Sequence, residues 1–206
     1  MGLDSNALLT ALAKLDACLS QPASLCFIGS SATTLSGQES RQTEGIDVWR
    51  PASSVRWNSL QAACEAAGVA FAPKDKFPEE PCLQVMHPGI VQLPGWDATK
   101  REWFGKPGQV VWQGERLTVL VPPARAIAAS KLVQGNARDL GDCLWLMAAQ
   151  GMDAEAIREA VEALPRGARR KAEDNLATLN LISPRRSGSV SPTTARSPAP
   201  CSQPQG

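Results

Sequence analysis

Two short polar segments could hold a phosphorylated ligand and the metal ion that often accompanies it. Gly29-Ser30 follows an apolar run at residues 24–28, and Asp47 lies in a second apolar run that begins at Ile46. A Gly-Ser turn lets backbone amides approach a phosphate closely, and the start of a following helix favours the negative charge. A carboxylate is a hard oxygen ligand that suits Mg²⁺. Both segments also have a structural interpretation, because Gly-Ser is a common strand-to-helix turn and Asp47 could be a satisfied polar residue at a strand edge.

The elements that would position these residues follow from the hydrophobic periodicity. Leucines at helical spacing predict a first helix that starts after Asp4 or Ser5 and ends before Pro22. Strands are predicted at residues 24–28 and from residue 46 to Pro51, with a polar loop over residues 37–44 between them. A helix from Ser53 or Ser54 to Gly68 comes next, and short apolar runs then predict strands at residues 69–71, 83–86, 90–93, 109–112 and 117–120.

The chain after Pro122 is predicted to be helical, with helices at residues 124–133, 138–149, 153–164 and 166–181. The expected fold class is α/β (α+β), with a mixed β-sheet, flanking helices and a helical C-terminal part. Residues 1–121 would form the α/β core, and residues 122–182 the helical C-terminal part of the same domain. Residues 183–206 are rich in Pro, Ser, Thr and Arg and are predicted to be a disordered tail.

Three segments together resemble the nucleotidyltransferase superfamily, which includes DNA polymerase beta and the kanamycin-type transferases. The family pattern is Gly-Gly or Gly-Ser after a first strand and Asp-hydrophobic-Asp on the second. Ile28-Gly29-Ser30 and Gly45-Ile46-Asp47 are the similar residues here. Small bacterial members of the toxin–antitoxin or abortive-infection type have a loop of the form Arg-x-Thr-x-Asp-Ile-Asp, similar to residues 41–47. Their C-terminal helices resemble residues 127–131 and 138–142, so the likeness covers roughly residues 5–181.

The resemblance implies transfer of a nucleoside monophosphate from an NTP to a protein or RNA acceptor. Two carboxylates side by side on a strand would hold Mg²⁺, which activates the attacking oxygen and neutralises the leaving pyrophosphate. The implied cofactors are therefore Mg²⁺ and an NTP. Asp47 would be the catalytic residue and metal ligand, and Gly29 and Ser30 would hold phosphates. Lys131 would steady the nucleotide, while Arg41 and Thr43 would either contact the triphosphate or hold the loop.

The sequence departs from the family pattern at its carboxylates. Gly45 stands where the family has the first Asp, and the strand predicted at residues 90–93 offers Gln92 where a third carboxylate is expected. Glu44 is adjacent, but its side chain should point to the opposite face of the strand. An alternative therefore stays open: a catalytically degenerate module that binds a nucleotide or a partner, for instance one component of a toxin–antitoxin pair. A third is a plain structural protein.

Other charged residues also allow two interpretations. A lysine on a helix, such as Lys131, is often a solvated charge, and the resemblance weighs a phosphate or substrate role equally. For Arg138, Asp139 and Asp142 the structural interpretation is favoured, because acids at a helix start complement the helix dipole and pair with nearby cations. Trp96 and Trp103 lie in a predicted loop, where we expect exposure.

Composition excludes several classes of protein. The net charge of +1 gives no broad electrostatic case for DNA, RNA or an anionic membrane, and 43% apolar residues argue against disorder of the whole chain. The six cysteines form no CxxC pair and are expected to be reduced and mostly buried. One histidine, His87, makes a His-rich metal centre or a Ser-His-Asp triad improbable. With no basic N-terminal region and no apolar run near the ~20 residues of a membrane span, we expect a cytoplasmic protein.

Overall fold

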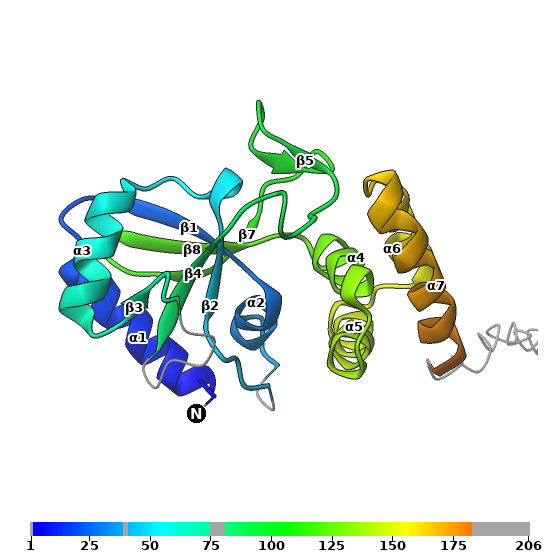
Figure 1. Cartoon of the computed structure of the whole chain (residues 1–206), viewed down its shortest axis with the longest axis horizontal. Coiled ribbons are helices and arrows are strands. Elements are labelled where there is room, and N and C mark those ends of the chain that lie inside the picture. The colour runs from blue at the N-terminus through cyan, green and yellow to red at the C-terminus, as the bar shows by residue number, and fades with distance from the viewer. Residues whose placement is uncertain (1, 39–40, 75–80, 183–206) are drawn as a thin grey trace, which may run out of the picture.

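A mixed six-stranded sheet with flanking helices forms one part of the protein, and four helices follow it (Figure 1). The structure is a computed structural model that describes residues 2–38, 41–74 and 81–182. The elements in chain order are α1 (Ser5–Cys18), β1 (Ala23–Ile28), α2 (Gly29–Leu35), β2 (Ile46–Trp49), the 3₁₀ helix η1 (Arg50–Ala52), α3 (Trp57–Ala67), β3 (Ala70–Phe71), β4 (Cys82–Met86), β5 (Trp96–Asp97), β6 (Glu102–Trp103), β7 (Gln109–Gln113), β8 (Leu117–Val121), α4 (Ala124–Gln134), α5 (Ala137–Gln150), α6 (Ala154–Glu162) and α7 (Arg166–Ile182).

The strand order in the sheet is β3-β4-β2-β1-β8-β7. β1 pairs parallel with β8 and antiparallel with β2, while β2 and β3 both pair parallel with β4. Figure 1 shows α1 and α3 at one end of the molecule and α4 to α7 grouped at the other, with α2 between them. The expected fold class, α/β (α+β) with a mixed sheet, flanking helices and a helical C-terminal part, is confirmed. The predicted tail, residues 183–206, lies outside the described residues.

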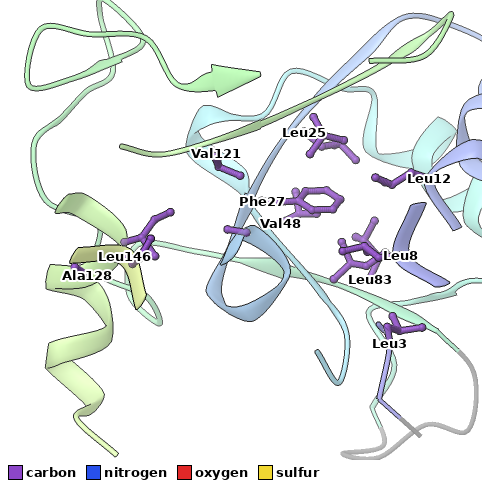
Figure 2. Packing of buried hydrophobic residues seen from close by; sticks show 14 of the residues in the cluster. Leu3, Leu8, Leu12, Leu25, Phe27, Val48, Leu83, Val121, Ala128 and Leu146 are labelled. Carbon is purple, nitrogen blue, oxygen red and sulfur yellow. The ribbon is translucent and has the colours of Figure 1, made fainter. Parts of the chain in front are cut away.

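Successive side chains of β1 point to opposite faces of the sheet and enter different apolar clusters. Leu25 and Phe27 pack in the large core beside the leucines of α1 (Figure 2). Cys26 and Ile28 pack in a smaller cluster on the other face, together with Trp49. Since Ile28 is the register partner of Asp47, the carboxylate of Asp47 belongs to this second face. The alternation of side chains along β1 thus decides on which face of the sheet a site with Asp47 can form.

The strand predicted at residues 90–93 is wrong. The N–H groups of Ile90 and Val91 both donate to the carbonyl of His87, which closes a turn around Pro88-Gly89. Gln92 follows this turn and donates from its side chain to the carbonyl of Pro88 at 2.6 Å. The apolar run is therefore part of a loop, and it carries no carboxylate position beside β2.

The start predicted for the third helix, at Ser53 or Ser54, is also too early. Both serines are used by β1 instead of by a helix: Ser53 Oγ accepts from the backbone N–H of Cys26, and Ser54 forms a backbone bridge with Ser24. Their backbone is held extended by these contacts, so α3 begins at Trp57. Local sequence marks a capping residue but not the distant strand that competes for it.

The expected exposure of Trp96 and Trp103 is wrong as well. The small β5–β6 hairpin folds both rings over Trp49, with ring centroids of Trp96 and Trp103 4.3 Å apart and Trp103 only 1% exposed.

The cysteines behave largely as expected: the described ones are free, and all are buried except Cys18. None of the helices in the described part of the chain is long and apolar enough to cross a membrane.

Candidate functional site

A pocket of about 230 Å³ opens where the end of β1 and the start of β2 meet α4 and the loop after β4. Its lining includes the apolar side chains of Met86, Val91, Leu93 and Ile127. It also includes four residues that the resemblance singled out, Gly29, Ser30, Asp47 and Lys131, together with Asp139. Gly29 and Lys131, which are 102 positions apart in the sequence, therefore line one pocket.

Gly29 is needed because Asp47 lies directly against it. Its φ of +62° is a left-handed conformation, and a Cβ added at this position would lie 2.8 Å from Asp47 Oδ2. The β1–β2 register brings Asp47 beside Ile28, so its carboxylate lies over the Gly29-Ser30 turn. Burial raises the pKa of Asp47 to about 6; the charge of Lys131 opposes this rise, and that of Glu44 adds to it. Asp47 is thus a poorly solvated carboxylate, and none of the ion pairs within 4 Å in the described part of the chain involves it.

Lys131 is buried and held by two aspartates of α5. Its Nζ lies 2.6 Å from Asp142 Oδ2 and 3.4 Å from Asp139 Oδ1. Asp139 also lies in the first turn of α5, where its backbone N–H donates to the side chain of Asn136, the N-cap residue. Both aspartates pair with a cation, as the structural interpretation expects. The partner is an interior lysine, however, so the solvated interpretation of Lys131 is wrong.

Arg41 connects the Gly-Ser turn to the helical part. Its terminal nitrogen Nη2 donates to Ser30 Oγ at 3.2 Å and lies 3.2 Å from Asp142 Oδ2. The second oxygen of Asp142 accepts from Gln38 Nε2 at 3.0 Å. Asp142 therefore receives donors from Lys131, Arg41 and Gln38 and ties the loop before β2 to α4 and α5. Sequence reasoning missed Gln38, since a glutamine in a polar loop carries no local signal.

Thr43 has a structural place. It is 3% exposed and donates from Oγ1 to the carbonyl of Gly45 at 2.6 Å, while its backbone pairs with Leu3. It does not line the pocket. Of the two roles left open for Thr43, holding the loop is the one that these contacts support, and a direct contact with a triphosphate is not.

The position of the first family carboxylate is filled by another side chain. A Cβ added at Gly45 would lie 2.7 Å from Cys82 Sγ and 3.2 Å from the carbonyl oxygen of Cys82. Burial raises the pKa of the Cys82 thiol, and the nearby charge of Asp47 raises it further. Gly45 is therefore glycine because the thiol of the neighbouring strand β4 takes the space. Nothing in the local sequence around Gly45 could have indicated Cys82.

Gln92, at the position where a third carboxylate is expected from the resemblance, does not lie on a strand beside β2. Gln84 on β4 is the register partner of Asp47 and carries a neutral amide. Within residues 2–38, 41–74 and 81–182, no group of three or more His, Cys, Asp or Glu side chains is placed to hold a metal ion. The residues present do not fit a two-metal centre. Asp47 could supply one carboxylate to a Mg²⁺ ion, which in proteins often takes its remaining ligands from water and from substrate phosphates.

Glu44 and Arg138 stay outside the pocket. Their side chains are 74% exposed and form an ion pair at 3.6 Å.

Comparisons of the chain with protein-family models, with curated proteins and with solved structures find no match.

Proposed function

We propose that the protein binds a nucleoside triphosphate in this pocket, as a nucleotidyltransferase-like module that has lost two-metal transfer chemistry. The observation that carries the proposal is the meeting of Gly29-Ser30, Asp47 and Lys131, from three separate segments, at one cavity. A pocket with an apolar wall and a few convergent polar groups is a common form of small-molecule site.

The polar lining residues offer donors for phosphate. Ser30 and Lys131 line the pocket, whereas Arg41 does not line it and is joined to it by its hydrogen bond to Ser30 Oγ. The carboxylate of Asp47 lies against Gly29, so its negative charge would repel a phosphate bound there without a metal ion. Bound Mg²⁺ would supply the positive charge that allows Asp47 and a phosphate to lie close together. Recognition of a metal-bound nucleotide is therefore favoured over recognition of a free one.

The apolar lining residues offer a surface for a base. Met86, Val91 and Leu93 come from the end of β4 and the loop that follows, and Ile127 comes from α4. None of these side chains is aromatic, so a base would be held by burial of its faces and with little preference among bases. The polar and apolar lining residues match the two chemically different parts of a nucleotide.

The donor set favours binding over transfer. Cys82 fills the space beside Gly45, and Gln84 stands beside Asp47, so one carboxylate remains where the family mechanism uses three. An acceptor, whether protein or RNA, is needed only by a transferase. Under this proposal the chain acts by binding, for example as one component of a toxin–antitoxin pair.

Labelled ATP with Mg²⁺ tests the proposal in one set of samples. We expect saturable binding, no label transferred to the protein or to added RNA, and roughly tenfold weaker binding by Ser30→Ala. Ser36→Ala is the matched control, because Ser36 Oγ donates to the carbonyl of Ala32 at the opposite end of α2. Covalently transferred label would contradict the loss of transfer. Absent binding, or equal binding by both variants, would contradict the assignment of the pocket.

A further inference from the structure

A second pocket lies at the start of α3, the helix that Figure 1 shows at the far end of the molecule from α4 to α7. Its volume is about 620 Å³, which is within the range of small-molecule sites. Arg50 and Arg56 line it, together with Trp57 and uncharged polar residues. None of the described residues lines both this pocket and the one that contains Asp47. We call it the arginine pocket.

The charge of the arginine pocket is positive and uncompensated. No aspartate or glutamate of the described segments lines it. None of the ion pairs within 4 Å among residues 2–38, 41–74 and 81–182 involves Arg50 or Arg56. Other arginines do have a carboxylate within this distance: Arg41, Arg125, Arg138 and Arg158. Two cations in one hollow without an acidic partner attract an anion.

Arg50 is held at the arginine pocket by the ring of Trp57. Its guanidinium carbon lies 5.3 Å from the centroid of the indole, in a cation–π contact. Such a contact uses the face of the guanidinium, so the N–H groups in its plane stay available to an anion. The side chain of Arg50 is thereby partly ordered before a ligand arrives, which lowers the entropy that binding costs.

Further donors surround the two arginines. Ser20 Oγ and Ser59 Oγ, which both belong to lining residues, are hydrogen-bonded to each other at 2.9 Å. One hydroxyl proton is used in such a pair, so the other remains free to donate to a ligand. The N-cap residue of α3, Arg56, makes no side-chain cap hydrogen bond, and the first backbone N–H groups of a helix have no partner within the helix. The donors available here are thus several and of different kinds.

We propose that the arginine pocket binds the phosphate group of a small phosphate monoester. The inference does not depend on the function proposed for the other pocket. Two guanidinium groups match the charge of a phosphate monoester, about −1.5 to −2 at neutral pH, better than the single charge of a carboxylate. Their planar N–H groups also suit phosphate oxygens. Trp57 is the single aromatic lining residue among those described, and Arg50 lies over its ring. The other lining residues are polar, so we expect a polar organic part, such as a sugar.

Calorimetry of the full chain without Mg²⁺ tests the inference, with glucose 6-phosphate, glucuronate and glucose as probes. We expect glucose 6-phosphate to bind saturably and at least about tenfold more tightly than glucuronate, and glucose to show no binding. Arg50→Gln and Arg56→Gln should each weaken the binding of glucose 6-phosphate about tenfold, because charged donors are lost. Arg166→Gln is the matched control. Arg166 is also an exposed arginine at a helix start, but it lies on α7 and lines neither pocket.

Each alternative result would overturn the inference. Absent binding of glucose 6-phosphate, or glucuronate binding as tightly, would show that the arginine pocket does not select a phosphate group. Equal loss in Arg166→Gln would show a general attraction of the protein for anions. Unchanged binding in Arg50→Gln and Arg56→Gln would place the ligand elsewhere. The comparison of the three probes needs no variant, and a failure here leaves the nucleotide proposed for the other pocket untouched.

Discussion

Two parts of the pocket lining, the sheet wall on β2 and the helical wall on α4 and α5, differ in whether their charged side chains are paired. The sheet wall has Asp47 alone, with the thiol of Cys82 beside Gly45 and the amide of Gln84 in register. The helical wall, built on α4 and α5, has Lys131 between Asp139 and Asp142, with Arg41 joining from the loop. The sheet wall therefore has one carboxylate without an ion-pair partner within 4 Å among the described residues, whereas the charges of the helical wall pair with one another.

The same difference affects stability. Asp142 receives two cations and an amide, so its buried charge is compensated and links two parts of the fold. Asp47 has no ion-pair partner within 4 Å among the described residues, and burial raises its pKa to about 6. We therefore expect substitutions at the helical wall to cost stability, and removal of the Asp47 charge to improve stability at neutral pH.

The largest effect is expected for Asp142→Ala. Removing this carboxylate leaves Lys131 and Arg41 without their shared partner, which should lower the free energy of unfolding by about 3–5 kcal/mol. Denaturant titration measures the loss. The control is Glu159→Ala, whose exposed pair with Arg125 at 3.2 Å should contribute less than about 1 kcal/mol. If both variants lose equally little, the helical wall is not the compensated network described above.

Gly45→Asp should have an intermediate effect on the sheet wall. The new side chain must displace Cys82 Sγ, 2.7 Å from the position of its Cβ, so we expect a loss of about 1–3 kcal/mol. Gly45→Asp combined with Cys82→Ala should be more stable than Gly45→Asp alone, because the thiol no longer occupies the space. Thermal unfolding of both variants and of Cys82→Ala alone gives the comparison. A Gly45→Asp protein as stable as wild type would show that Cys82 does not fill this position.

A smaller effect is expected from the pH dependence of Asp47. Its folded pKa of about 6 lies above the ordinary value of 3.8, so the folded protein binds this proton more tightly than the unfolded chain. The contribution of Asp47 to the free energy of unfolding therefore falls as pH rises through this interval. Asp47→Asn removes the fall and should gain about 1 kcal/mol relative to wild type between about pH 4 and pH 7. A difference that stays constant over this range would show that Asp47 is not desolvated.

Local patterns predicted much of the fold. The leucines of α1 and the alternation within β1 carry their own periodicity, and both elements form as expected. The hairpin of β7 and β8 also follows from two apolar runs around a short turn. The misplaced strand at residues 90–93 shows the limit, because an apolar run of four residues fits a turn as well as a strand.

The candidate site was less predictable, because its key contacts join distant segments. Gly29, Ser30, Asp47 and Lys131 could be named from the resemblance, and all four line the pocket. The contact between Gln38 and Asp142 spans 104 positions, and the close approach of Gly45 to Cys82 depends on the pairing of β2 with β4. Neither contact has a signal in the neighbouring residues, so only the folded chain reveals them.

The central claim is that Asp47 binds the nucleotide through a metal ion and performs no transfer. The most direct measurement is calorimetry of ATP with wild type and Asp47→Asn, each in Mg²⁺ and in chelator. Wild type should bind ATP at least about tenfold more tightly in Mg²⁺, because the ion separates Asp47 from the phosphates. Asp47→Asn should bind equally in both conditions, and in chelator more tightly than wild type, since the repelling charge is gone. The same dependence on Mg²⁺ in both proteins would contradict the account.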